Sequence, residues 1–310
     1  MAGSENPERP FGLTKPLGAL RWVDRLVVAY TLLASVPAGI GAARGIPGCV
    51  GQLFANAAIL ASIALLCRLS RRSRNRPLIF LRLAYAPIMF LFFYRQTGAL
   101  WPALHGGAFD PWVAGLEECI FGFQPALRFA PFLPNAWAGE LLSFAYFAYY
   151  CFTPILILTV LFNRGYEAAE RVVTATALCF FACYTFFWLF PVVGPFYWFA
   201  PYHGPELSSG WIFNHVIFFF TSRGEVATGA FPSSHLAVAV LQTLYARRFA
   251  PRLFPFMLIV TILMVPAVVY LRAHYVVDVP IGILVGLLFA VPELKRRKSA
   301  QEASVGGIQR

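Results

Sequence analysis

Two short stretches carry the side chains best suited to chemistry, GAFPSSH at residues 229–235 and HYVVD at residues 274–278. Each brings a histidine to the boundary of an apolar run. Between them lie two apolar runs, 236–249 and 253–271, joined by a short basic turn. If one run is a helix leading away and the next a helix returning, His235 and His274 lie at the same end of a hairpin. Two imidazoles placed together can divide nucleophilic attack and proton transfer between them.

The second stretch suggests an activated histidine. His274 and Asp278 are four residues apart at the start of the last apolar run, and positions four apart share one face of a helix. A carboxylate that accepts a hydrogen bond from the imidazole fixes its tautomer and makes the other ring nitrogen a better nucleophile. A His/Asp pair can equally satisfy two polar groups inside a bundle, so this pair alone does not decide between the two interpretations.

The first stretch suggests an anion-binding helix start. Pro232, Ser233 and Ser234 are residues that begin helices, which places His235 in the first turn. Unpaired N–H groups and the helix dipole there favour an anion, commonly phosphate. His235 would then act as general acid beside a phosphate held by Ser233 and Ser234. The arginines available to neutralise its charge are Arg272, Arg223 and Arg95.

A metal site is the competing chemical interpretation, because His, His and Asp are also metal ligands. A phosphate-binding helix start facing the His/Asp pair would add nothing to metal binding. We therefore expect neither a metal nor another cofactor.

The elements that position these residues are membrane helices. The chain is 59% hydrophobic and 13% charged, whereas soluble domains carry about 25% charged residues. Its apolar residues come in blocks near the length of about 20 that crosses a bilayer. We predict an all-α polytopic membrane bundle (23–293) between a cytoplasmic tail (1–22) and a basic, disordered cytoplasmic tail (294–310). Its eight candidate spans are 23–43, 50–67, 77–95, 141–162, 172–190, 235–250, 253–271 and 275–292.

The charge distribution predicts an orientation rather than a nucleic-acid partner. The net charge is +11, but the basic residues cluster in short loops, above all RLSRRSRNR at 68–76. With both termini cytoplasmic, most basic residues fall inside, as membrane proteins prefer. All five histidines then fall outside. We expect an extracytoplasmic site, periplasmic if the membrane is a bacterial inner membrane.

Two long segments on the same side as the histidines are rich in aromatic residues. The segment 97–139 contains a predicted interfacial helix, and 191–231 contains an apolar piece of about a dozen residues, too short to cross. Such segments suit a pocket for a membrane lipid, or equally an ordinary interfacial belt.

Together the two stretches resemble the type 2 phosphatidic acid phosphatase superfamily, whose patterns include a PSGH-like motif and a later HxxxD motif. The resemblance covers roughly residues 95–292. It implies a six-helix-type phosphatase core in which His274 forms a phosphohistidine, Asp278 assists it and His235 protonates the leaving alcohol.

The chain departs from that family's usual pattern in its phosphate-binding residues. The family's first motif, a lysine followed after six residues by RP, does not occur, and the position six before His274 is Val268 rather than arginine. With the aromatic PVVGPFYW stretch, these departures are more similar to the branch of inositol phosphorylceramide synthases.

Three functions follow as hypotheses. The first is a lipid phosphate phosphatase that uses water as acceptor. The second is a phosphotransferase that passes the phosphoryl group to a second alcohol. The third is a transporter whose His/Asp pair relays protons. The transporter would need ionisable residues at mid-bilayer in several spans, and the spans contain few.

Overall fold

The computed structural model describes residues 20–71, 75–133, 136–202, 210–224 and 226–306, with the side chains of 202, 221–224 and 294–306 left out of the description. Within these ranges the chain is helical and contains no strand. The long helices are α1 (Trp22–Ala43), α2 (Cys49–Ser70), α3 (Arg76–Leu100), α6 (Ala136–Arg164), α7 (Tyr166–Leu189), α10 (Ser234–Phe249), α11 (Phe254–Tyr270) and α12 (Asp278–Gly306). Shorter ones are α4 (Asp110–Phe121), α5 (Pro125–Phe132), α8 (Pro195–Trp198), α9 (Phe213–Gly224) and the 3-10 turns η1 (Trp101–Ala103) and η2 (Ala200–Tyr202).

Each of the eight predicted spans coincides with a helix, and five helices are long and apolar enough to cross a membrane. These are α1, α2, α3, α6 and α7, with mean hydropathies of 1.7–1.9. At 1.5 Å per residue, 22 residues cover the roughly 30 Å of a hydrocarbon core. Helix α11 is apolar but shorter, at 17 residues. The all-α polytopic bundle is confirmed.

The predicted tails fare differently. Residues 1–19 lie outside the described residues, so most of the N-terminal tail is not described. The disorder expected of the tail at 294–310 is not found as far as Gly306, because α12 continues to that residue. The cytoplasmic side of this tail stays a prediction.

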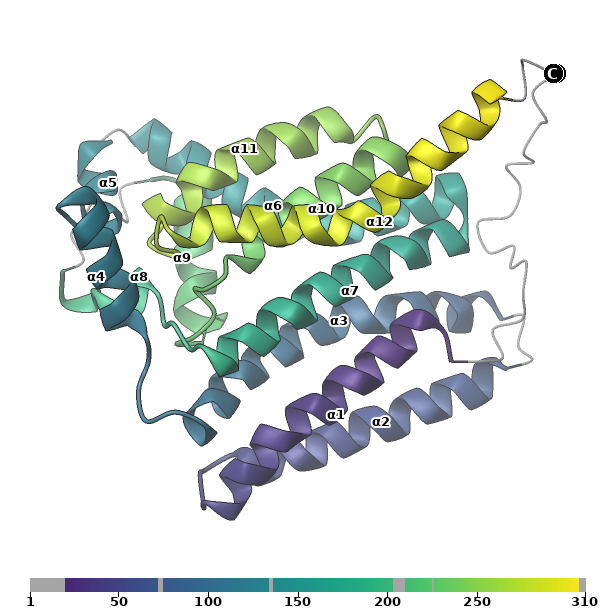
Figure 1. The fold of residues 1–310 in the computed structure, drawn as a ribbon, viewed down its shortest axis with the longest axis horizontal. Helices are drawn as coiled ribbons and strands as arrows, with labels where there is room; N and C mark the ends of the chain where they lie inside the picture. Colours follow the sequence, from purple (N-terminus) through teal and green to yellow (C-terminus); the bar gives the residue numbers. More distant parts are fainter. Residues whose placement is uncertain (1–19, 72–74, 134–135, 203–209, 225, 307–310) are drawn as a thin grey trace.

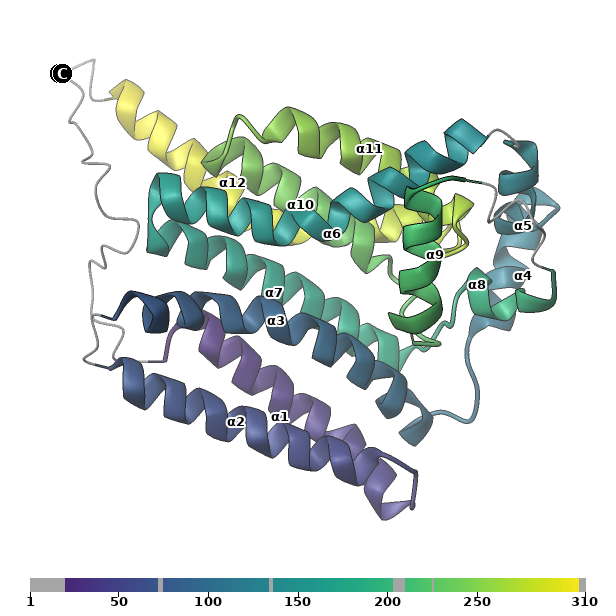
Figure 2. The ribbon, with the colours of Figure 1, turned by 180° about the vertical axis from the view of Figure 1, so that it is seen from behind.

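The long helices form two groups that share α7. Helices α1 and α2 lie side by side next to α3 and α7, and α6, α10, α11 and α12 pack on the other side of α7 (Figures 1 and 2). Helices α4, α5, α8 and α9 gather at one end of the bundle, which we call the site end. The helix predicted at the interface in 97–139 is α4, and the short apolar piece in 191–231 is α9, which runs crosswise to the long helices (Figure 2).

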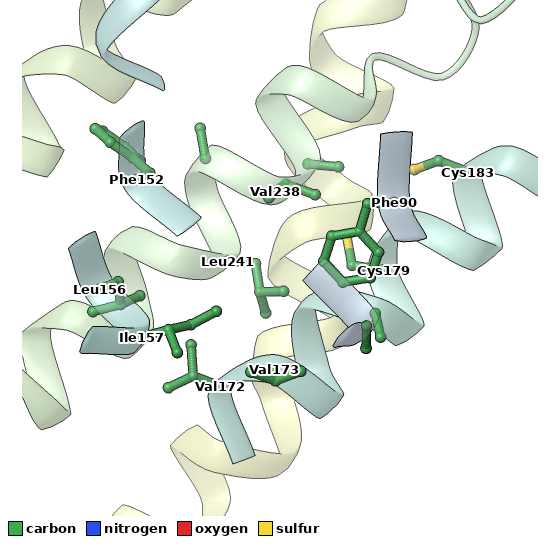
Figure 3. Packing of buried hydrophobic residues seen from close by; sticks show 14 of the residues in the cluster. Phe90, Phe152, Leu156, Ile157, Val172, Val173, Cys179, Cys183, Val238 and Leu241 are labelled. Carbon is green, nitrogen blue, oxygen red and sulfur yellow. The ribbon is translucent and has the colours of Figure 1, made fainter. Parts of the chain in front are cut away.

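The core joins the two groups through side chains of α7. Figure 3 shows Val172, Val173, Cys179 and Cys183 of α7 among apolar side chains of α3, α6 and α10. All six cysteines are free. The buried ones act as small apolar side chains in this packing.

A buried ion pair lies at the opposite end of the bundle from the site end. Arg82, near the start of α3, contacts Asp24 in the first turn of α1, and both side chains are fully buried. The hydroxyl of Tyr85 donates a hydrogen bond of 2.8 Å to the same carboxylate. Because these groups satisfy one another, they tie α1 to α3 close to the basic loop rather than at mid-bilayer.

Helices α10 and α12 touch through their backbones. Gly282 and Gly286 of α12 form a GxxxG pair. A Cβ atom at Gly282 would lie 2.5 Å from the carbonyl oxygen of Ser233, and one at Gly286 would collide with the carbonyl oxygen of Ala237. Small residues at this spacing allow membrane helices to approach closely. The contact fixes the start of α12 against the start of α10.

Candidate active site

A small cavity, partly open to the outside, lies at the site end. Two of its side chains come from long helices, Tyr94 of α3 and Tyr146 of α6, and a third, His235, from the first turn of α10. The rest come from three loops that meet there. The full lining is Tyr94, Tyr146, Val193, Phe196, Tyr197, Val226, Thr228, Gly229, Ala230, His235, Ala273 and His274.

His235 is placed by the helix start that its sequence predicts. Helix α10 begins at Ser234, and the hydroxyl of Ser233 accepts a hydrogen bond of 3.4 Å from the N–H of Leu236. Ser233 and Ser234 are buried, and neither lines the cavity. The hydroxyl of Ser233 therefore caps its own helix.

His274 lies in a tight turn after α11 and is 1% exposed. Its Nδ1 is 2.6 Å from the carbonyl oxygen of Ala230. A carbonyl only accepts, so Nδ1 carries the hydrogen and neutral His274 has its lone pair on Nε2. That Nε2 is 3.0 Å from Nδ1 of His235. The structure therefore brings together the two histidines that the sequence paired, with the nucleophilic nitrogen of one facing the other.

Asp278 lies beside His274, although not as the sequence analysis expected. Helix α12 begins at Asp278, so the prediction that His274 and Asp278 share a helical face was wrong. The carboxylate oxygen Oδ2 is 3.6 Å from Nδ1 of His274, too far for a hydrogen bond. It accepts instead the N–H of Tyr275 at 2.8 Å. The carboxylate of Asp278 therefore lies buried beside the imidazole of His274 without a direct hydrogen bond to it.

Three tyrosines of α6 surround His235, and the sequence analysis missed them. The hydroxyl of Tyr146 is 3.0 Å from Nε2 of His235, and that of Tyr150 is 3.4 Å away. The rings of Tyr146 and Tyr149 lie with centroids 4.8 and 5.2 Å from the imidazole. The only sequence signal is the run FAYFAYY at 144–150, whose tyrosines recur at helical spacing.

Two buried carboxylates of α4 hold the loops of the site, and these were missed as well. Asp110 accepts the N–H groups of Val193 and Gly194 at 2.7 and 2.9 Å and the hydroxyl of Tyr275 at 3.0 Å. Glu117 accepts the N–H of Val276 and, at 3.3 Å, that of Val277. The two acids are seven residues apart, two helical turns on one face. They fasten the turn between His274 and Asp278 to α4.

Glu117 predicts a pH dependence of stability. Its pKa is raised from 4.5 to about 7, chiefly by burial and also by the charge of Asp278, while the hydrogen bonds from the two N–H groups oppose the shift. Folding therefore takes up a proton between these values. The stability from this group is present below pH 4.5 and is lost as the pH rises through about 7.

We expect Glu117→Gln to flatten that dependence, because an amide does not titrate here and can still accept both N–H groups. The measurement is the apparent unfolding midpoint in detergent at pH 5 and pH 8. The midpoint of the wild type should fall more between the two than that of the variant. Burial also raises the pKa of Asp110, but that contribution is common to both proteins. Equal pH slopes would contradict the assignment to Glu117.

Two of the three predicted phosphate-binding arginines, Arg272 and Arg95, lie outside the cavity lining. Arg272 is buried, its Nε donates a hydrogen bond of 3.1 Å to the carbonyl oxygen of Ala126 in α5, and its backbone adopts a left-handed φ of 59°. Arg95 follows the cavity residue Tyr94 on α3 and is exposed. Arg223 lies in α9, but its side chain is outside the described part. Neither Arg272 nor Arg95 lines the cavity.

No group of three or more His, Cys, Asp or Glu side chains within the described ranges is arranged to hold a metal ion. What the site offers instead is a pair of hydrogen-bonded imidazoles at a small cavity. The lone pair on Nε2 of His274 accepts a hydrogen bond from Nδ1–H of His235.

The fold and site define a class: an integral membrane helical bundle with two facing histidines at the loops of one end. The sequence comparison identifies the family within it. The model of the PAP2 superfamily matches residues 112–291, more than half of the chain, and the chain belongs to this superfamily. The matched part runs from α4 to α12 and contains both histidines. No curated protein and no solved structure gives a significant match.

Proposed function

We propose that the protein is a lipid phosphate phosphatase that works through a phosphohistidine on His274. Membership of the PAP2 superfamily supports a phosphatase or phosphotransferase activity. The observation that carries the proposal is the contact of 3.0 Å between Nε2 of His274 and Nδ1 of His235, together with the Nδ1–H of His274 held by Ala230. This arrangement leaves a lone pair on the nitrogen that faces the cavity.

In the first half-reaction Nε2 of His274 attacks phosphorus and the bond to the leaving alcohol breaks. His235 donates its Nδ1 proton to the departing oxygen, which general acids of this kind accelerate by about 10²–10⁴-fold. As the imidazole of His274 becomes cationic, the nearby charge of Asp278 and the carbonyl of Ala230 stabilise it. In the second half-reaction an acceptor cleaves the phosphohistidine and restores His274.

The phosphate oxygens need donors in addition to the histidines. We propose the start of α10, with Ser233 and Ser234, as the centre of that binding site, because its first N–H groups and its dipole favour an anion. Arg223 and Arg95 are the proposed cationic partners. Arg272 is proposed to act on the loop rather than on the substrate, since its guanidinium is bonded to α5.

The proposed substrate is a membrane lipid phosphate. The cavity is lined mostly by aromatic and aliphatic side chains. Two helices of the site end, α4 and α9, carry exposed aromatic residues such as Trp112 and Phe219. The described basic residues of the 68–76 stretch, Arg68, Arg71 and Arg76, lie at the opposite end of the bundle (Figure 1), which supports an extracytoplasmic site by the usual charge bias. A bacterial inner membrane with both termini cytoplasmic is the proposed setting.

The alternative acceptor is an alcohol. The absence of the family's usual lysine and RP motif from the sequence keeps a headgroup phosphotransferase of the inositol phosphorylceramide synthase type as the second candidate. Both candidates share the first half-reaction. They differ only in the molecule that accepts the phosphoryl group from the phosphohistidine, which is water in one and an alcohol in the other.

The test is phosphate release by the purified protein in detergent with EDTA present. The panel is phosphatidic acid, phosphatidylglycerophosphate, a prenyl pyrophosphate and ceramide phosphate. We expect release from at least one lipid and an acid-labile, alkali-stable phosphoenzyme on rapid quenching. Headgroup exchange only when a second lipid or inositol is added would identify the phosphotransferase. No phosphoenzyme and no turnover under either condition would overturn both candidates.

A further inference from the structure

The hydroxyl of Tyr146 contacts the ring nitrogen of His235 that faces away from His274. It lies 3.0 Å from Nε2, whereas Nδ1 of the same ring is 3.0 Å from His274. Tyr146 is completely buried in α6, 89 residues before His235. Both ring nitrogens of His235 are therefore engaged, one by the nucleophile and the other by a phenol.

The hydrogens in this chain of contacts have one consistent direction in the resting state. Nδ1 of His274 donates to Ala230, so Nε2 of neutral His274 accepts and Nδ1 of His235 donates to it. Neutral His235 then has its lone pair on Nε2, which accepts the O–H of Tyr146. The resting order is Tyr146, His235, His274, Ala230, with each group donating to the next.

This order cannot persist when His235 acts as an acid. Neutral His235 that gave up its Nδ1 proton would become an imidazolate, which is not accessible near neutral pH. The acting form must therefore carry protons on both ring nitrogens, and Nε2 then needs an acceptor. A phenol oxygen can donate or accept, so the hydroxyl of Tyr146 suits both states.

We propose that Tyr146 is a positioning residue whose hydroxyl reverses its hydrogen bond with His235 during the catalytic cycle. The inference rests on the proposed function, because it assigns a role within the phosphohistidine mechanism. Tyr146 contacts the general acid and not the substrate phosphorus.

In the first half-reaction the bond between Nε2 of His274 and phosphorus forms and the bond from phosphorus to the leaving oxygen breaks. The proton on Nδ1 of His235 goes to that oxygen. Nε2 of His235 keeps its own proton, donated to the oxygen of Tyr146, so His235 ends as the neutral tautomer with a free lone pair on Nδ1.

In the second half-reaction that lone pair is the general base. Nδ1 takes a proton from the acceptor, water or an alcohol, as the acceptor oxygen bonds to phosphorus and the bond to His274 breaks. His235 is then doubly protonated again. Tyr146 thus keeps the reactive lone pair on the nitrogen that faces the phosphorus in both steps.

The surroundings of His235 favour this assignment to Tyr146. The ionisable groups that contact the imidazole within the described residues are His274 from the loop after α11 and three tyrosines of α6, Tyr146, Tyr149 and Tyr150. Tyr94 of α3 and Tyr197 of the 193–197 loop share the cavity. Tyr150 is 47% exposed and its hydroxyl is 3.4 Å away, a weaker contact.

The experiment is the pH–rate profile of Tyr146→Phe against wild type, with Tyr149→Phe as the matched comparison. The first change removes the hydroxyl at 3.0 Å, and the second removes a hydroxyl from a neighbouring ring that packs on the same imidazole. Without its acceptor, doubly protonated His235 loses a charge-assisted bond. We expect Tyr146→Phe to move the alkaline limb about one to two pH units lower. Turnover near neutral pH should fall about ten- to a hundredfold, and Tyr149→Phe should move the limb far less.

A second measurement needs no substrate. Nitrogen-15 shifts of the labelled imidazole follow the protonation of each ring nitrogen of His235 as the pH changes. His274 should keep Nδ1 protonated in both proteins, and Tyr146→Phe should lower the pH at which Nε2 loses its proton, because the doubly protonated ring has lost its acceptor. If that variant fails to fold, 3,5-difluorotyrosine at position 146, a weaker acceptor of similar shape, should move the alkaline limb in the same direction. Superimposable limbs, or an unchanged titration of Nε2 of His235, would overturn the inference while leaving the phosphohistidine mechanism standing. A wild type that forms no phosphoenzyme would overturn the proposed function, and the nitrogen-15 titration of His235 would still decide the role of Tyr146.

Discussion

Replacing His274 with alanine is expected to lower turnover by about 10⁴-fold or more, the scale of removing a covalent nucleophile. The reason is geometric: Nε2 of His274 is the nitrogen whose lone pair faces the cavity, since Nδ1 is bonded to Ala230. Alanine leaves no group that can form the bond to phosphorus. Rapid quenching with a ³²P-labelled lipid phosphate measures the phosphoenzyme directly, and the label should be absent from the variant.

His215→Ala is the matched control for that measurement. His215 is an exposed histidine of α9 whose Nδ1 contacts the carbonyl of Trp211, just before that helix. Its removal should leave the label and the turnover near wild type. A His274→Ala protein that still forms an acid-labile phosphoenzyme would show that another side chain is the nucleophile.

Replacing His235 with asparagine is expected to produce a loss that depends on the leaving group. An alkoxide from a lipid phosphate needs a proton as it departs, and loss of the general acid should cost about 10²–10⁴-fold. The phenolate of p-nitrophenyl phosphate departs without a proton, so its first step should be slowed far less. His235 packs against the rings of Tyr146 and Tyr149 at the cavity, and asparagine is a smaller polar side chain that brings no new bulk or charge to this place.

The ratio of the two losses, measured as phosphoenzyme formation with each substrate, reports the role of His235. A lipid-to-aryl ratio well above one is the expected result. Equal losses on both substrates would mean that His235 binds or orients the phosphate and that another group supplies the proton.

The long helices could be predicted from the sequence because each is a local signal: an apolar run bounded by basic or Pro- and Gly-containing loops. The pairing of His235 with His274 also followed, because two adjacent runs form a hairpin that returns to the same end. The start of α10 was predictable from Pro232 and Ser233, whose preferences are local.

The remaining features of the site depend on contacts with distant segments. The imidazole of His274 donates to the backbone carbonyl of Ala230. Every residue type has such a carbonyl, so the sequence cannot indicate which one is the acceptor. The turn at 274–277 delays the start of α12 until Asp278, which separates the predicted helical pair. Tyr146 and Glu117 reach the site from other helices, and only the packing of α6 and α4 brings them there.

The close contact of α12 on α10 also bears on how the protein responds to its lipids. A change in bilayer thickness is absorbed by helices that tilt or shift. Gly282 and Gly286 place α12 directly on the backbone of α10, so these two helices must move together. In α2, by contrast, only 17% of the most apolar stretch is buried, against 56% in α7. We therefore expect a change in membrane thickness to reorient the α1–α2 hairpin first. The distance between the imidazoles of His235 and His274 should change little with the acyl-chain length of the lipids.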